Sequence, residues 1–301
     1  MNDMMVNELV KEDKITQDRV EQAFRKVKRH HFLKGIVDPE EAYEDRPIMI
    51  KGRVSSSSQP YVMAMMLEEL DLKKDHKVLE IGTASGYNAA LLSEVVGSDQ
   101  LVYSIEIEGD LAQRAGKLLK EAGYSGVTVI AGDGRKGYPV SAPYDRIIVT
   151  AEGKTIYNNL LKQLASDGIL LIPFNFYGAI TVTVKLSQID EDIYRGPLVG
   201  FPVNFVPIRG VDLDKLEDSE HKEIVSCYNM LKKQLSVSNL FLDNDEMIGL
   251  VLLMISRYKE TDHLDYRQLI DDFKKGGLPG IDGFEFEYDK KKEDWKLIPQ
   301  F

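Results

Sequence analysis

The sequence predicts an α/β protein built on a doubly wound parallel sheet with helices on both faces. Between residues 77 and 188, short apolar strands alternate with helical segments of about a dozen residues, which is typical of a parallel sheet with helical crossovers. A glycine-containing turn follows the first of these strands and opens a helix. Residues 211–301 do not show this alternation of strands and helices, so we expect a mainly helical C-terminal extension.

The N-terminal part is predicted to be helical as far as about Leu33, with Thr16 as the N-cap of the second half. Residues 35–54 are rich in Pro and Asp and should form a loop. The Met- and Leu-rich stretch 59–70 predicts a helix whose methionines pack in the core.

Strands and helices then alternate through the predicted sheet. The first strand, the turn after it and the following helix are expected, in that order, within residues 77–96. The later strands are expected at 101–108, 127–134, 144–152, 169–175 and 179–188, and the helices at 109–123 and 156–168. In the extension we expect helices at 211–235 and 244–259 and a loop or hairpin at 276–301.

Composition excludes several classes of protein. The net charge of -11 disfavours binding to nucleic acid or anionic lipid, and the basic stretch 25–31 is interpreted as the polar face of a helix. Cys227 is the only cysteine, which suits a reducing compartment. Neither a signal peptide nor a run of roughly 18 apolar residues is evident, so we expect a soluble, cytoplasmic protein. No histidine pair has metal-ligand spacing, so no metal is expected.

Acidic residues close three successive predicted strands. Glu80 precedes the turn 82–86, Glu106 ends the next strand, and Asp133 with Gly134 follows the third. The turn has Gly82 and Gly86 but Ala84 between them, so it lacks the middle glycine that lets a backbone approach a pyrophosphate. A carboxylate at the second strand end suits two ribose hydroxyls. The row of carboxylates therefore favours a nucleoside with a cationic or amine tail, such as S-adenosylmethionine.

From about Ala23 to Gly210 the sequence resembles the protein-L-isoaspartate O-methyltransferases. The resemblance rests on "AYEDRPIMI", "SSSSQPYVMAMMLEEL", "VLEIGTASGYNAALL", "GDGRKGYP", "APYDRIIVTA", "LLKQLASDGILLIP" and "FVPIRG". It implies a Rossmann-like methyltransferase sheet, S-adenosylmethionine as the cofactor, and a peptide or protein carrying an isoaspartyl or aspartyl carboxylate as the partner.

The resemblance also implies roles for individual residues. Ser58 takes the place of the family's active-site serine, and the substrate would be bound by Ser56, Ser57, Ser58 and Arg209, the last either turned inward or on the surface. The cofactor would be bound by Glu80, Gly82, Ser85, Gly86, Glu106, Asp133 and Gly134. A carboxylate is ionised at neutral pH, so its methylation needs orientation rather than a strong base.

The sequence departs from the family pattern in three places. Ala84 replaces the usual glycine, which adds a methyl group and removes easy access to positive φ. Val54 and Ser55 stand where the family usually has Gly-Gln, and Ser57 replaces an apolar residue. The family normally ends soon after "FVPI", whereas this chain continues to residue 301.

We therefore expect three parts: an N-terminal helical and substrate-loop segment (1–75), the S-adenosylmethionine-binding domain (76–210) and the extension (211–301). Three functions remain open. The first is methylation of L-isoaspartyl carboxylates in protein repair. The second is methylation of an aspartate in one specific partner that the extension docks. The third is a non-catalytic cofactor-binding scaffold. The sequence does not indicate an oligomeric state.

Overall fold

The computed structural model describes residues 1–52, 54–209, 226, 244–261 and 280–300, and these fall into two units. The first unit holds residues 1–152, 157–172 and 205–209. The second holds residues 153–156 and 173–204 with the described residues from 226 onward. Each unit is presented separately below.

The first unit begins with three helices, a small antiparallel sheet and a fourth helix. The elements are α1 (Asn2–Lys11), α2 (Asp18–Lys26), α3 (Arg29–Phe32), β1 (Ile48–Lys51), β2 (Ser55–Ser57) and α4 (Pro60–Glu69). β1 pairs with β2, so part of the expected loop 35–54 is in fact a strand. Ser55, Ser56 and Ser57 are each paired with a residue of β1, so the backbone ladder fixes their positions.

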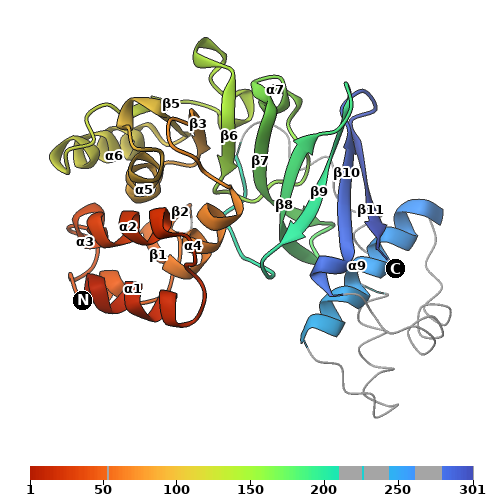
Figure 1. Ribbon diagram of the computed structural model, residues 1–301, viewed down its shortest axis with the longest axis horizontal. Coiled ribbons are helices and arrows are strands. Elements are labelled where there is room, and N and C mark those ends of the chain that lie inside the picture. The colour runs from red at the N-terminus through yellow and green to blue at the C-terminus, as the bar shows by residue number, and fades with distance from the viewer. Residues whose placement is uncertain (53, 210–225, 227–243, 262–279, 301) are drawn as a thin grey trace. The chain divides into compact units, whose positions relative to one another are not determined.

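A parallel sheet follows, in the order β7-β6-β3-β4-β5 (Figure 1). Its elements are β3 (Val78–Ile81), α5 (Tyr87–Val96), β4 (Val102–Glu106), α6 (Gly109–Glu121), β5 (Thr128–Ala131), β6 (Tyr144–Val149), α7 (Asn158–Leu161) and β7 (Leu164–Phe176), of which residues 164–172 belong to this unit. From β3 the chain moves outward through β4 and β5, then returns to the other side of β3. The switch point between β3 and β6 is where doubly wound sheets bind ligands.

The second unit contains an antiparallel sheet in the order β8-β9-β10-β11. The strands are β8 (Ile180–Gln188), β9 (Ile193–Val199), β10 (Phe284–Asp289) and β11 (Asp294–Pro299), and α9 (Asn244–Thr261) packs on β11. β10 alternates buried and half-buried residues, the period of a strand with one face in the core. Phe286 stacks on Trp295, with ring centroids 5.6 Å apart, within an aromatic cluster that includes Phe174 and Phe176.

The described part of the C-terminal extension therefore combines one helix with a hairpin, rather than being mainly helical. The hairpin was one of two alternatives for 276–301, and helix α9 confirms the helix expected at 244–259. The helix expected at 211–235 lies outside the described residues except for Ser226, which is helical. Within the described residues, no helix combines the length and apolar character that crossing a bilayer requires.

Two local predictions were wrong because tertiary partners override local pattern. Thr16 is not an N-cap: Gln17 holds that place, and the Thr16 hydroxyl donates instead to Glu68 Oε2 at 2.7 Å. The helix expected at 156–168 is only one turn long, because Leu164 already pairs with Tyr144 at the start of β7.

Candidate active site

A pocket of about 590 Å³ lies at the carboxyl ends of β3, β4 and β6, and we call it the first pocket. Its residues come from four segments: the ends of these strands with the turn after β3, the turn after β5, the β2 loop, and residues 206–209. The pocket thus occupies the place that the switch point of the sheet predicts.

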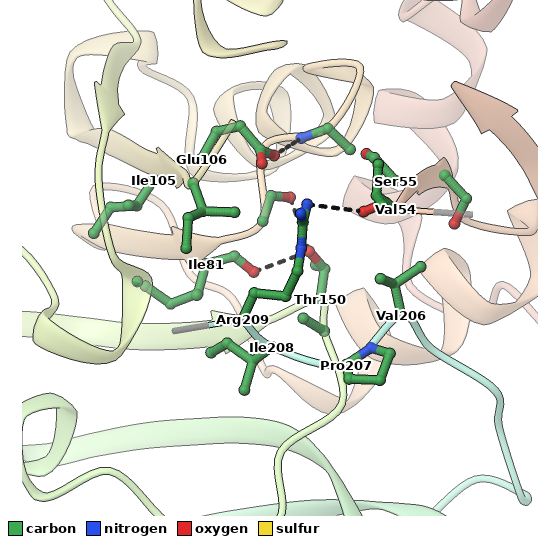
Figure 2. Close-up of a pocket in the computed structure, with 16 residues that line it drawn as sticks. Val54, Ser55, Ile81, Ile105, Glu106, Thr150, Val206, Pro207, Ile208 and Arg209 are labelled. Carbon is green, nitrogen blue, oxygen red and sulfur yellow. Dashed lines mark hydrogen bonds between the residues drawn. The ribbon is translucent and has the colours of Figure 1, made fainter. Parts of the chain in front are cut away.

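Glu106 is the acidic group of this pocket, and its carboxylate is held in a fixed orientation (Figure 2). Its Oε2 accepts a hydrogen bond from the Ala84 N–H at 2.8 Å, and its Oε1 accepts one from the Glu108 N–H at 3.1 Å. The residue is 5% exposed. Each oxygen can accept a further hydrogen bond, so a bound ligand with hydroxyl donors can share this carboxylate.

The serine segment, residues 55–58, is positioned by two side chains that the sequence reasoning missed, those of Arg29 and Asp45. The buried Arg29 guanidinium donates to the Ser58 carbonyl at 2.9 Å and to the carbonyls of Ala42, Glu44 and Arg46. Burial lowers the pKa of Arg29 to about 10, so it stays protonated at neutral pH. Asp45 accepts from the Tyr61 N–H at the start of α4 and from the Gln59 amide.

Arg29 also corrects the interpretation of residues 25–31 as a polar helix face. Arg29 is completely buried, and it lies in the short helix α3 together with His30 and His31. Buried carbonyls from the loop that follows need donors, and one guanidinium supplies them all. Nothing in the sequence of the basic stretch 25–31 indicates that Arg29, unlike its neighbours, is buried.

Residues 206–209 form one wall of the first pocket. The wall is attached to Glu152 by two backbone hydrogen bonds, from Glu152 N to Val206 O (3.0 Å) and from Ile208 N to Glu152 O (2.8 Å). At its end Arg209 forms an ion pair with Glu108 at 2.8 Å and donates to the Val54 carbonyl at 3.3 Å (Figure 2). Arg209 thus lines the first pocket, while its side chain is 38% exposed.

Lys51 binds the other oxygen of Glu108 at 2.6 Å, and this hydrogen bond lowers the pKa of Glu108. Glu108 therefore accepts hydrogen bonds from two cations, Lys51 in β1 and Arg209 at the end of the wall. Through these two contacts, the loop after β4 is bonded both to the β1–β2 sheet and to residues 206–209.

A second pocket of about 380 Å³ lies on the other side of the turn after β3. The two pockets share Ser56, Gly82, Ala84 and Thr150. The second pocket is further lined by Ser57, Ser58, Thr83, Ser85, Asn88, Ile148, Met63 and Met66. The two methionines are buried as core residues, as expected, yet they also line this pocket.

The structure brings together most of the predicted site residues. Ser56, Gly82, Glu106, Gly134 and Arg209 line the first pocket, and Ser56, Ser57, Ser58, Gly82 and Ser85 line the second.

Glu80, Gly86 and Asp133 line neither pocket. Glu80 is fully buried and accepts from Ser104 and Asn88, whereas Asp133 is paired with Arg135 at 2.8 Å. Gly86 is the N-cap of α5, at φ +87°, and packs against α6.

The turn after β3 also corrects the expectation about Ala84. Ala84 has φ +48°, so alanine does adopt the left-handed conformation here, at a cost of about 1–2 kcal/mol relative to an unstrained residue. Gly82, at φ +107°, lies so close to Thr150 that a Cβ would come within 2.4 Å of the Thr150 hydroxyl. Thr150 was missed by the sequence reasoning, although it directly follows β6 just as Glu106 ends β4.

Comparison with known proteins identifies the family. Residues 1–211 match the family model described as protein-L-isoaspartate(D-aspartate) O-methyltransferase (PCMT). The chain belongs to this family.

Two curated relatives carry the name protein-L-isoaspartate O-methyltransferase. The one from Ignicoccus hospitalis is 43% identical over 208 residues, covering 68% of this chain and 95% of the relative. The one from Methanosarcina mazei is 44% identical over 181 residues, covering 60% and 73%.

Two solved structures share the fold. A protein-L-isoaspartate O-methyltransferase structure has a TM-score of 0.70 and 21% identity, and the match covers all of both chains. A Plasmodium falciparum protein described as a beta-aspartate methyltransferase (PCMT), in complex with S-adenosyl-L-homocysteine, has a TM-score of 0.61 and 21% identity, over 69% of this chain and 98% of that one. The second match and the Ignicoccus hospitalis relative end within about the first two thirds of this chain's length, as expected for the family, whereas the first structural match covers all of this chain.

Proposed function

We propose that the chain is an S-adenosylmethionine-dependent carboxyl O-methyltransferase that acts on L-isoaspartyl residues of peptides and proteins. One observation carries the proposal. Glu106 is held by two backbone N–H groups inside a pocket formed by the glycine turn, the serine segment and the wall 206–209. Relatives that are 43% and 44% identical to this chain carry the name protein-L-isoaspartate O-methyltransferase.

The residues of the first pocket fit the nucleoside half of the cofactor. A carboxylate at the end of the second parallel strand is the partner that ribose hydroxyls use in doubly wound folds. Ile81, Ile105 and Ile208 supply apolar surface for a base, and Gly134 contributes backbone without a side chain. When bound, S-adenosylmethionine supplies an electrophilic methyl group on a sulfonium.

Ser58 and Ser56 are assigned to the acceptor carboxylate. Both line the second pocket, and Arg29 fixes the Ser58 backbone from the opposite side. A hydroxyl can donate to a carboxylate without competing with it as a nucleophile at neutral pH. Holding one carboxylate oxygen in line with the methyl group can contribute roughly 7–11 kcal/mol to lowering the barrier.

Arg209 is assigned to the substrate side of the first pocket. It ends the wall, and its charge is partly balanced by Glu108. A guanidinium that is already oriented by one carboxylate can donate to a second carboxylate along its other edge.

The expected product explains the repair role. In the transfer, a carboxylate oxygen forms a bond to the methyl carbon as the carbon–sulfur bond breaks, and no proton is exchanged. The ester formed on an isoaspartyl carboxylate can be attacked by the next backbone nitrogen, which releases methanol and closes a succinimide. Hydrolysis of that ring returns part of the chain to the aspartyl linkage.

The proposal is tested with two peptides that differ only by isoaspartate or aspartate at one position. We expect transfer of labelled methyl from S-adenosylmethionine to the isoaspartyl peptide alone, with labelled methanol released as the ester closes. Transfer to the aspartyl peptide would refute the isoaspartyl assignment. Transfer to neither, with S-adenosyl-L-homocysteine still binding, would instead favour a dedicated partner.

We further propose that the enzyme works in the cytoplasm. Its single cysteine suits a reducing compartment, where no disulfide is needed for stability. Fractionation of the native cells would test this placement: we expect the protein and the methyl transfer activity in the cytoplasmic fraction, and their recovery elsewhere would refute it.

A further inference from the structure

Glu108 lies just outside the first pocket and contacts three segments that border it. Its Oε1 pairs with the Arg209 guanidinium at the end of the wall at 2.8 Å, and its Oε2 pairs with Lys51 Nζ at the end of β1 at 2.6 Å. Its backbone N–H donates to Glu106 Oε1 at 3.1 Å. One residue therefore contacts the wall, the β1–β2 sheet and the carboxylate that we assign to the ribose.

The two cations connect Glu108 to the β2 loop, whose residues 54–56 line the pocket. Arg209 Nη2 donates to the Val54 carbonyl at 3.3 Å, so this side chain reaches from the wall to the β2 loop (Figure 2). The Val54 N–H donates in turn to the Lys51 carbonyl at 3.0 Å. The contacts thus close a ring from Glu108 through Arg209, Val54 and Lys51 back to Glu108. We call the three charged side chains, those of Lys51, Glu108 and Arg209, the ionic clasp.

The wall and the β2 loop lie outside the parallel sheet, unlike the other sides of the pocket. Ile81 and Glu106 end β3 and β4, whose positions the parallel ladder fixes. The wall is attached to Glu152 by its two backbone hydrogen bonds, and Arg209 attaches its end to the β2 loop and to Glu108. Release of Arg209 would therefore let the wall and the β2 loop separate while the sheet stays in place.

We propose that the ionic clasp controls the exchange of the cofactor, with Glu108 as the residue that positions both cations. The inference rests on the proposed function, which places the nucleoside in the first pocket, and deepens it. S-adenosyl-L-homocysteine leaves and S-adenosylmethionine enters in every turnover, so the clasp opens and closes once in each cycle. Every contact of the clasp joins two protein groups, so the clasp slows the entry and the exit of the ligand alike.

The exposure of the clasp makes it sensitive to salt. The side chains of Lys51, Glu108 and Arg209 are 40%, 22% and 38% exposed, so dissolved ions reach them. The Debye length falls from about 10 Å at 0.1 M salt to about 3 Å at 1 M, and exposed ion pairs weaken accordingly. S-adenosyl-L-homocysteine is a zwitterion without net charge at neutral pH, so salt changes its own attraction to the protein much less. The rate of exchange should therefore rise with ionic strength.

The test measures the association and dissociation rate constants of S-adenosyl-L-homocysteine on the full chain by surface plasmon resonance. In Glu108→Gln, both rate constants should rise about threefold, and the dissociation constant should stay within about twofold. The substitution keeps the backbone N–H that Glu106 accepts, so it changes the clasp alone. The wild-type dissociation rate should rise at least about twofold between 0.1 M and 1 M NaCl, and that of Glu108→Gln should change much less.

Asp110→Asn is the matched control, because Asp110 also binds Lys51, at 2.9 Å, but is not part of the ring that Glu108 closes. Its rate constants should match those of the wild-type protein. A misfolded variant would bind less ligand without binding it faster, so a raised association rate constant also reports folding. Unchanged rates in Glu108→Gln, or the same salt dependence in both proteins, would overturn the clasp while leaving the proposed function intact. A wild-type protein that does not bind S-adenosyl-L-homocysteine would refute the proposed function itself.

Discussion

Replacing Glu106 with glutamine should weaken cofactor binding more than any other single change in the first pocket. The Glu106 carboxylate uses one lone pair on each oxygen for the N–H groups of Ala84 and Glu108. Glutamine keeps the shape but turns one acceptor into a donor. That NH₂ group must then face either a backbone N–H or a ribose hydroxyl, so at least one hydrogen bond to a charged acceptor is lost.

Hydrogen bonds to charged groups contribute about 1.5–3 kcal/mol, which corresponds to a dissociation constant about 10- to 150-fold higher. The assay is titration calorimetry with S-adenosyl-L-homocysteine. Asp110→Asn is the matched control, because it removes a nearby carboxylate that is exposed and does not line the pocket. If Glu106→Gln binds within twofold of the wild-type protein, Glu106 is not the ribose partner.

Three further predictions concern packing, pH and turnover. Gly134→Ala should destabilise the fold by about 1–3 kcal/mol, since its Cβ would come within 2.2 Å of Ile81 Cγ2; Gly132→Ala, with open space around its Cβ, should change the melting temperature little. Burial raises the pKa of Glu80 to about 7. Between about pH 4.5 and 7, the Glu80 carboxyl is therefore more protonated in the folded protein than in the unfolded chain. Stability should therefore fall as pH rises from about 4.5 to 7, and Glu80→Gln should flatten this dependence in denaturant titrations; a parallel pH profile would contradict the assignment. Ser58→Ala should lower kcat for the isoaspartyl peptide more than it raises the dissociation constant of S-adenosyl-L-homocysteine, and an unchanged rate would remove Ser58 from the mechanism.

Truncating the chain after residue 210 would not isolate the role of the extension. β10 pairs with β9, and Phe286 contacts Phe174 and Phe176, which lie before residue 211. Removing β10 would expose an edge strand and an aromatic face, and both favour aggregation. Substitutions on the exposed face of the hairpin are the better way to test whether the extension docks a partner.

The order of strands and helices could be predicted because each segment carries its own signal. Apolar runs, the glycine turn and the acidic residues at strand ends are local features, and the parallel topology brings Glu106 and Thr150 to the same edge of the sheet. Short-range pattern was therefore sufficient for the fold class and for the edge of the sheet at which the first pocket lies.

Residues that act through distant partners could not be predicted in this way. Arg29 is buried because four carbonyls from residues 42–58 need hydrogen-bond donors. The residues next to Arg29 in the sequence give no sign of these distant acceptors. Thr16 binds Glu68 across 52 positions, which no capping rule anticipates. Ala84 takes a left-handed conformation because its N–H must reach Glu106.

The most direct test of the central claim follows the fate of the acceptor. An isoaspartyl peptide is incubated for many turnovers with the full chain and S-adenosylmethionine, and its isomers are separated by chromatography and mass spectrometry. We predict that the aspartyl peptide accumulates at the expense of the isoaspartyl peptide, with the succinimide between them, and only when the methyl donor is present. An isoaspartyl peptide that remains unconverted, while the protein still binds S-adenosyl-L-homocysteine, would contradict the account.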